Sequence, residues 1–361
     1  MDTELKPVQF ISPEKDGLDK RICHEAGNEV AAYIYATIPE EELIAEPFFA
    51  EDVCWEPDSR ITDARLFFDF RPANFNSGMN EYFCKVNKCM GATGLFIGCF
   101  ESRYNLQEKI FLNYPKPIAW LIILFHFALR NILPVSKPRK RKIRKQTTSL
   151  RNSNTLAEVL GRLAYCGFEI LGYAYFNNLT YFITRKKSEP RTETVSTSRF
   201  IVSLKRVGKG GKMISIFKVR SMYPYSEFIQ DYVVKINGYD TMGKPGNDFR
   251  LTRIGKIIRR LFIDEIPQLY NLLIGDLRLV GVRPIGRYGY TALPQDLQVR
   301  RIRKRPGLLP PHIALRKRGI AGVIQAERQY LDERDRNPFR TDIKFCFLAV
   351  FNILFFRVKS S

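Results

Sequence analysis

The chain has 361 residues, with 58 Lys and Arg against 37 Asp and Glu, which gives a formal net charge of +21. This length suggests two domains, and a hydrophobic content of 45% is enough to build real cores. The positive charge implies an anionic partner, either nucleic acid, acidic lipid headgroups or a phosphorylated substrate. The polar, acidic N-terminus predicts no signal peptide. Cys84 and Cys89 find no second Cys or His pair, which excludes a zinc set.

The first half of the chain, after 59 residues without a clear pattern, alternates strands with helices. We predict strands at 64–70, 94–100, 168–175 and 179–184, and helices at 76–90 and 155–165. This order indicates an α/β layer domain and resembles the C-terminal half of class I methyltransferases. Because no glycine-rich turn follows an early strand, the resemblance implies a degenerate Rossmann-like domain without a nucleotide cofactor.

An apolar segment at 118–129, followed by the polybasic run 137–145, interrupts this domain. Twelve helical residues reach about 18 Å, which is too short to span a bilayer of about 30 Å. Apolar and basic residues in succession favour binding within one leaflet with anionic headgroups, and a buried helix followed by a solvated loop is the alternative. No aromatic residues alternate with the basic ones, so no nucleic-acid partner is expected. The predicted membrane contacts are Trp120, Leu121, Phe125, Lys140 and Arg141.

A polar segment rich in Ser and Thr divides the chain. We therefore predict a Rossmann-like domain at 1–187 with the apolar and polybasic insertion at about 114–146, a linker at 188–199, and a second domain at 200–361. The second domain begins with two predicted strands, 202–207 and 213–219, joined by the glycine-rich turn GKGGK. Arg206 stands where a P-loop needs its first glycine, so no P-loop is predicted. Lys218 and Arg220 alternate with apolar residues, which places both on one strand face.

The second domain is organised around two adjacent carboxylates, Asp264 and Glu265. We predict one helix before this pair and one helix after it. Apolar residues recur at the spacing of one buried helical face before and after the pair. They are Ile254, Ile257, Ile258 and Leu261 in the first helix, and Ile266, Leu269, Tyr270 and Leu273 in the second. Pro267 suits a first helical turn and Gly275 a helix end, so the carboxylates lie near a helix N-terminus.

Neighbouring helical residues point about 100° apart, so the two carboxylates suit two different roles. One carboxylate can attack a phosphorus atom while the other holds Mg²⁺. A pair that only caps a helix is the alternative reading of an isolated Asp-Glu dipeptide.

The motifs around the pair read D-x-R-x-T-R-x-G-K-x-x-R, then D-E-x-P-Q-L-x-N, then G-D-x-x-x-V-G-x-R-P, and they follow KRVGKGGKMISIFKVRSM at 205–222. Together they resemble the catalytic core of the bacterial sugar transferases, the monotopic phosphoglycosyl transferases that start glycan assembly on polyprenyl phosphate. The resemblance covers 203–356 and implies an α+β transferase domain. It does not extend to the long apolar re-entrant helix that usually precedes this core, where the present chain has only the polar linker.

The resemblance implies an initiating enzyme of exopolysaccharide, capsule or O-antigen assembly at the cytoplasmic face of the bacterial inner membrane. It would transfer a sugar phosphate from a UDP-sugar to polyprenyl (undecaprenyl) phosphate and release UMP. Asp264 would be the nucleophile and Glu265 the Mg²⁺ ligand. The substrate-binding residues would be Lys218, Arg220, Arg259, Arg283, Asn271 and Asp276. A homo-oligomer or other glycan-assembly proteins are further partners to consider, and an inactive membrane-associated scaffold is the alternative function.

Three positions depart from the family pattern near the carboxylates, namely Phe262, Arg278 and Val282, and we interpret them as a divergent substrate pocket. Two further segments are ambiguous in the sequence. The basic cluster 300–305 suits lipid headgroups, prenyl phosphate or a solvated surface. The closing helix at 343–356 is apolar on all sides, which predicts burial in protein or in lipid.

Overall fold

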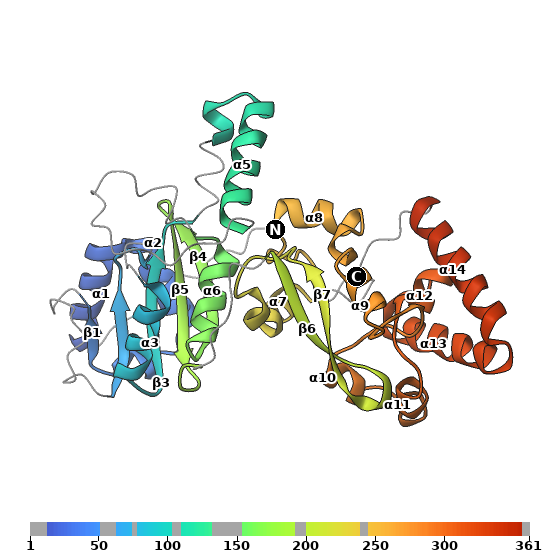
Figure 1. Ribbon diagram of the computed structural model, residues 1–361. Helices are drawn as coiled ribbons and strands as arrows, with labels where there is room; N and C mark the ends of the chain where they lie inside the picture. The colour runs from blue at the N-terminus through green and yellow to red at the C-terminus, as the bar shows by residue number, and fades with distance from the viewer. Residues whose placement is uncertain are drawn as a thin grey trace. The chain divides into compact units, whose positions relative to one another are not determined.

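The computed structural model describes residues 13–50, 63–73, 78–102, 110–131, 154–191, 200–238 and 245–355. The chain divides into two compact units. Figure 1 shows the elements of both, coloured from blue at the N-terminus to red at the C-terminus. Unit 1 comprises 1–126, 137–195 and 224–229, and unit 2 comprises 127–136, 196–223 and 230–361. The predicted membrane contacts Lys140 and Arg141 lie outside the described residues, as does most of the predicted linker.

The elements of unit 1 include every strand and helix predicted in the first half of the chain, with boundaries shifted by a few residues. They are α1 (Pro13–Ala26), α2 (Asn28–Thr37), η1 (Glu40–Ile44), β1 (Pro47–Phe49), β2 (Ala64–Asp69), α3 (Met79–Cys89), β3 (Met90–Phe100), α5 (Lys116–Asn131, of which 127–131 fall in unit 2), α6 (Leu156–Tyr165), β4 (Phe168–Phe176), β5 (Leu179–Lys186) and η4 (Ser226–Ile229). The prediction missed α1, α2, η1, β1 and η4.

The sheet of unit 1 has five strands in the order β1-β2-β3-β5-β4. The first three strands are parallel, and β5 runs antiparallel to both β3 and β4. The unit is therefore mixed α/β, as predicted from the alternation of strands and helices.

Both faces of this sheet are covered by helices, as the left part of Figure 1 shows. Leu66 and Phe68 of β2 pack with α1 and α2 in one apolar core. Phe67, from the same strand, points to the opposite face and contacts the ring of Phe96, which in turn contacts Phe83 of α3. Since successive strand residues alternate between faces, a strand buried on both sides reads as a continuous apolar run.

Unit 2 contains short elements arranged around a two-stranded antiparallel hairpin and a three-helix region near the C-terminus. They are β6 (Ile201–Val207), η3 (Lys209–Gly211), β7 (Met213–Val219), α7 (Gln230–Asn237), α8 (Arg253–Arg260), η5 (Ile263–Glu265), α9 (Gln268–Leu273), β8 (Arg278–Val280), α10 (Arg287–Thr291), α11 (Gln295–Ile302), β9 (Gly307–Leu309), α12 (Pro311–Ala314), α13 (Gly319–Arg336) and α14 (Pro338–Phe355). The predicted hairpin is confirmed, and Gly210 and Gly211 in its turn have positive φ values of 66° and 76°.

The predicted helices on either side of the carboxylates exist, but their predicted buried face is wrong. In α8 only Ile258 of the apolar positions is buried, whereas Ile257 is exposed. In α9 the buried residues are Gln268 and Asn271, and Leu273 is 85% exposed. The inner sides of both helices make polar contacts described below, which leaves their apolar residues outside. The 257–274 apolar surface, as we call it, consists of Ile257, Leu261, Ile263, Ile266, Leu269, Tyr270, Leu273 and Ile274, each exposed.

Exposed apolar residues also occur on α5 and α14. The predicted membrane contacts Trp120, Leu121 and Phe125 are all exposed on α5. On α14 one face packs into the core of unit 2 through Phe345 and Ala349, while the remaining faces carry exposed Phe and Leu side chains. Within the parts of the chain that the structure describes, no helix has both the length and the apolar composition to span a bilayer.

Candidate active site

The two carboxylates lie side by side in the short 3₁₀ turn η5, three residues before α9 begins. Asp264 is 3% exposed and Glu265 is half-buried. The Lys218 ammonium donates a hydrogen bond to Oε1 of Glu265 at 2.9 Å, and it lies 3.9 Å from Oδ2 of Asp264. The structure thus brings together three residues that the sequence assigned to one site, although Lys218 precedes Glu265 by 47 positions.

Asn271 fixes the strand that carries Lys218. The Asn271 side chain is fully buried, and its amide oxygen accepts a hydrogen bond from the Phe217 N–H at 3.0 Å. Its amide nitrogen donates to the Ser215 carbonyl at 2.7 Å and lies 3.4 Å from Oδ2 of Asp276. These bonds join α9 to the backbone of β7, so Asn271 and Asp276 are placed to position Lys218.

Arg259 extends from the last turn of α8 toward the carboxylates. Its Nε donates to Oγ of Ser221 at 2.8 Å. Burial lowers the pKa of Arg259, while the nearby carboxylates of Asp264 and Asp248 raise it. Because a guanidinium stays charged in proteins, Arg259 contributes a fixed positive charge beside Asp264.

Arg283 is held through its backbone by a buried ion pair. Its N–H donates to Oε1 of Glu327 at 3.2 Å, and its carbonyl accepts a hydrogen bond from Arg301. Arg301 also pairs with Glu327, and both side chains are buried. Burial lowers the pKa of the Arg283 guanidinium, and Glu265 and Glu327 raise it. The neighbourhood of Glu265 places Arg283 at the same site as Lys218 and Arg259.

The sequence reasoning missed Glu327, Arg301 and Ser221. Glu327 shares the buried face of α13 with Ala326, Tyr330 and Leu331. A carboxylate at apolar spacing implies a buried partner, and this signal was available in the sequence. The basic cluster 300–305 was interpreted as a site for lipid headgroups or prenyl phosphate, or as a solvated surface. For Arg301 this interpretation is wrong, because its side chain is buried.

The site as a whole carries more positive than negative charge. Lys218, Arg259 and Arg283 face the two carboxylates. Arg206 lies near Arg283, and both its own burial and the charge of Arg283 lower the pKa of Arg206. Glu327 and Asp248 are already paired with Arg301 and Arg250. The excess positive charge suits an anionic ligand with more than one phosphate.

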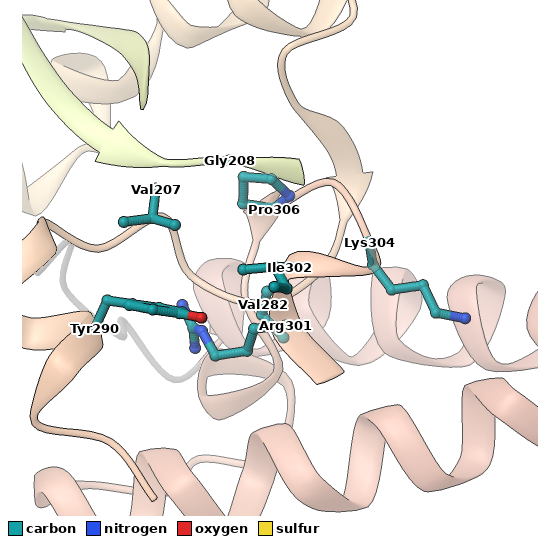
Figure 2. A pocket seen from close by; sticks show the side chains of 8 residues that line it. All are labelled: Val207, Gly208, Val282, Tyr290, Arg301, Ile302, Lys304 and Pro306. Atoms are coloured by element: carbon teal, nitrogen blue, oxygen red, sulfur yellow. The ribbon is translucent and has the colours of Figure 1, made fainter. Parts of the chain in front are cut away.

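A small pocket lies beside the Arg283 support and is shown in Figure 2. It is lined by Val207, Gly208, Val282, Tyr290, Arg301, Ile302, Lys304 and Pro306. The hydroxyl end of Tyr290 points toward Arg301, whereas Lys304 points away and pairs with Asp335 at 3.0 Å. This pocket therefore belongs to the packing behind Arg283.

Arg220 and the three departures from the family pattern lie at different places. Arg220 directly follows β7, and its N–H donates to the Phe200 carbonyl at 2.7 Å. Arg278 pairs with Asp342 of α14 at 2.5 Å, while Val282 and Phe262 contribute to the apolar core of unit 2. Arg278 is thus engaged in joining β8 to α14. Phe262, immediately before η5, has a φ of +57°, a left-handed conformation that is strained for an aromatic residue.

These contacts define a class of site. A buried carboxylate suited to covalent chemistry lies next to a second carboxylate, a lysine and two half-buried arginines, Arg259 and Arg283. Such a set can bind a diphosphate, stabilise the charge that develops at phosphorus, and accept a phosphoryl group on the carboxylate. The arrangement is therefore suited to the transfer of a phosphoryl group.

Comparison with known proteins finds a family model that matches this part of the chain. Residues 192–355 match the family model for bacterial sugar transferases, which confirms the resemblance drawn from the motifs. Over 153 residues the chain is 32% identical to UDP-N-acetylgalactosamine-undecaprenyl-phosphate N-acetylgalactosaminephosphotransferase of Aeromonas hydrophila, covering 41% of this chain and 30% of that protein.

Two further relatives are named for the transfer of other sugars. The galactosyl transferase CpsE of Streptococcus agalactiae serotype III is 36% identical over 137 residues, 37% of this chain and 30% of the relative. The UDP-glucose:undecaprenyl-phosphate glucose-1-phosphate transferase of Caulobacter vibrioides is 36% identical over 128 residues, 34% of this chain and 43% of the relative. The chain thus spans less than half the length of each of these relatives.

Proposed function

We propose that the protein is a phosphoglycosyl transferase that moves a sugar phosphate from a UDP-sugar to a polyprenyl phosphate, as the first step in the assembly of a surface polysaccharide. The observation that carries the proposal is the buried Asp264 beside Glu265, Lys218, Arg259 and Arg283. It lies inside the segment that matches the bacterial sugar transferases. The named activities of the relatives support an undecaprenyl phosphate acceptor.

The proposed reaction has two displacements at one phosphorus atom. In the first, an oxygen of Asp264 attacks the sugar-linked phosphorus of the UDP-sugar, and the bond to the bridging oxygen breaks. UMP leaves with the electron pair, and the sugar phosphate remains on Asp264 as an acyl phosphate. In the second, a phosphate oxygen of the polyprenyl phosphate attacks the same phosphorus and releases the Asp264 carboxylate.

The cationic residues lower the cost of bringing an anionic nucleophile to an anionic diphosphate. Lys218 lies within 3.9 Å of Asp264, so its ammonium can neutralise charge at the attacking oxygen and the phosphate together. Arg259 and Arg283 offer planar forks that match phosphate oxygens in a bidentate manner. Asn271, Ser221 and Glu327 act through these three residues, and we assign them positioning roles.

Mg²⁺ fits the site as a metal bound jointly by protein and substrate. No group of three or more acidic, His or Cys side chains that could hold a metal ion occurs among the residues the structure describes. Mg²⁺ needs only one or two carboxylates when substrate phosphates supply further oxygens, and Glu265 is the carboxylate that would hold it. When bound, the ion would neutralise diphosphate charge.

A membrane surface is the proposed location of the site, because the acceptor is a lipid. The 257–274 apolar surface extends from α8 past η5 to the end of α9, and so flanks both carboxylates. The exposed Arg253, Lys256 and Arg260 of α8 suit anionic headgroups. Exposed Trp120, Leu121 and Phe125 support the further proposal that α5 contacts a membrane, and the cytoplasmic face of the inner membrane is the proposed location because UDP-sugars are cytoplasmic donors.

The N-terminal unit is proposed to be a degenerate Rossmann-like domain of the methyltransferase type. Support comes from the parallel β2 and β3, with α3 between them in the chain, and from the closing antiparallel hairpin of β4 and β5. We expect calorimetric titration of the protein with S-adenosylmethionine to show no binding, and a stoichiometric heat signal would contradict the proposal.

The test of the proposed function is UMP release. Purified protein in detergent, with Mg²⁺ and undecaprenyl phosphate, is incubated with a panel of UDP-sugars beside an Asp264→Asn variant. We expect release with at least one sugar, and its loss in the variant because an amide oxygen is a poor nucleophile. Asp335→Asn, at an exposed position on α13, is the matched control and keeps full activity. If folded protein releases no UMP from any UDP-sugar of the panel, the result would favour an inactive membrane-associated scaffold.

A further inference from the structure

Six residues that follow the transferase motif at 205–222 belong to the N-terminal unit. The chain leaves unit 2 after Tyr223, contributes 224–229 to unit 1, and returns to unit 2 at Gln230. Within unit 1 this segment packs against α6 through η4. Tyr225, Ser226 and Ile229 are all buried there. The N-terminal unit therefore encloses a part of the chain that lies between two elements of the transferase unit.

The contacts of Tyr225 are numerous and specific. Its ring lies 4.4 Å from the Arg162 guanidinium and 5.4 Å from the ring of Tyr165. Its hydroxyl accepts a hydrogen bond of 2.5 Å from the side-chain amide of Asn80, which also accepts one from Arg162 at 2.6 Å. Tyr225 has a φ of +63°, and a left-handed non-glycine residue persists only where its surroundings hold it.

Gly161 makes the close approach of α6 to this segment possible. A Cβ atom at Gly161 would lie 2.3 Å from the Tyr225 carbonyl oxygen and 2.6 Å from its carbonyl carbon. Both are backbone atoms, so a side chain at this position would displace the segment. A glycine within a helix costs about 1 kcal/mol relative to alanine, and here the close contact accounts for it.

The residues just before the enclosed segment support the active-site arginine. The Ser221 carbonyl accepts a hydrogen bond from the Thr252 N–H at 3.1 Å, and the Tyr223 N–H donates to the Arg250 carbonyl at 2.9 Å. Thr252 caps α8, because its hydroxyl accepts from the Gly255 N–H at 2.7 Å. The Ser221 hydroxyl accepts from Arg259, which lies on the same helix. Residues 221–223 thus set the position of α8 and of Arg259.

We propose that the N-terminal unit is a clamp on 224–229 that positions Arg259, so that Gly161, Arg162 and Asn80 are positioning residues for phosphoryl transfer. The proposal rests on the proposed function for its effect on turnover, but the clamp itself is a structural claim. Loosening 224–229 would release 221–223, which would loosen α8 and withdraw the guanidinium from the diphosphate.

The experiment compares two Gly→Ala variants of the full-length protein. Gly161→Ala introduces the clash, whereas Gly17→Ala, in α1 of the same unit, adds a methyl group with no atom within 4 Å. Hydrogen–deuterium exchange is measured on peptides covering 221–229 and 250–260, and UMP release is measured in parallel. We expect faster exchange in both peptides and a fall in kcat of about tenfold only for Gly161→Ala.

A double-variant cycle separates positioning from general destabilisation. Ser221→Ala removes the Arg259 contact directly and lowers UMP release on its own. If the clamp acts through Ser221, combining it with Gly161→Ala reduces release by less than the product of the two single effects. Multiplicative effects would show that Gly161 acts by another route and would overturn the positioning claim.

Each outcome decides the proposal. Unchanged exchange at 221–229 and 250–260 in Gly161→Ala overturns the clamp, and faster exchange with normal turnover overturns its link to catalysis. If Gly161→Ala does not fold, Tyr225→Phe replaces it, because this change removes only the hydrogen bond between Asn80 and the Tyr225 hydroxyl. Unchanged exchange at 221–229 in Tyr225→Phe would likewise overturn the clamp. If wild-type protein releases no UMP, the proposed function fails, while the exchange data still judge the clamp.

Discussion

The sheet of the N-terminal unit and the α8–α9 stretch of the transferase unit bury opposite kinds of side chain. In β2 the consecutive residues Leu66, Phe67 and Phe68 have no exposed surface. In α9 the inward residues are Gln268 and Asn271, while the apolar residues lie outside. The sheet follows the hydrophobic pattern, because helices cover both of its faces. The α9 helix reverses it, because its inner side must hold the strand that carries Lys218.

This difference shows where apolar periodicity is a reliable guide to burial. Periodicity predicts which face of a helix is apolar, but it does not say whether protein or lipid covers that face. The reversal occurs next to the carboxylates, where polar side chains are needed inside and, on our proposal, a membrane is met outside. Three substitutions test the comparison.

The largest effect on stability is expected from Phe96→Ala in the sheet of unit 1. Phe96 is 1% exposed and contacts the rings of Phe67, Phe83 and Phe182. Its truncation should lower the free energy of unfolding by about 3–5 kcal/mol, measured by denaturant titration. Phe125→Ala, at an exposed position on α5, is the matched control, with an expected change within about 0.5 kcal/mol. Equal effects at the two positions would contradict the described core.

A smaller but more diagnostic effect is expected from Asn271→Leu in α9. The change keeps the volume of the side chain similar but leaves the Phe217 N–H and the Ser215 carbonyl without their partner. We expect a loss of about 2–3 kcal/mol in unfolding free energy, together with reduced UMP release because Lys218 is no longer fixed. Asn337→Leu, at an exposed position between α13 and α14, is the matched control and should change neither quantity. A stabilised Asn271→Leu protein would mean that α9 packs on an ordinary apolar core.

The smallest effect on stability, and a clear effect on lipid binding, is expected from Leu273→Glu. Its 85% exposure predicts a change in unfolding free energy within about 0.5 kcal/mol. Affinity for vesicles containing anionic lipids should fall by about tenfold to a hundredfold, because an inserted leucine contributes about 1.5–3 kcal/mol. Ile320→Glu, at a position on α13 that is 76% exposed, is the control and should bind vesicles like the wild-type protein. Identical vesicle binding by both variants would remove the 257–274 apolar surface from the proposed membrane contact.

Local patterns predicted four of the five strands of the unit 1 sheet, the β6–β7 hairpin and the helices α8 and α9, because strand and helix periodicities are carried by neighbouring residues. The helix α1 was missed, since its burial rests on a narrow stripe of Leu18, Ile22 and Ala26 among polar residues. In unit 2, the motif resemblance predicted that Lys218 lies at the same site as the carboxylates, and the structure places its ammonium 2.9 Å from Glu265. Tertiary contacts set the rest of the site.

The supports of the two arginines show this dependence on tertiary structure. The bond between Arg259 and Ser221 joins residues 38 positions apart, and the pair of Arg301 and Glu327 joins residues 26 apart. No local pattern encodes either distance. The integration of 224–229 into unit 1 is equally invisible in the sequence, since it depends on Gly161 meeting a distant backbone.

The central claim is that Asp264 carries the sugar phosphate between two displacements. The most direct measurement is intact-protein mass spectrometry after incubation with Mg²⁺ and the UDP-sugar identified by UMP release, with the lipid acceptor omitted. We predict an added mass equal to one sugar phosphate, located by peptide mapping at Asp264, absent from Asp264→Asn, and lost on addition of polyprenyl phosphate. Lipid-dependent turnover without this adduct, or an adduct that persists in Asp264→Asn, would contradict the account.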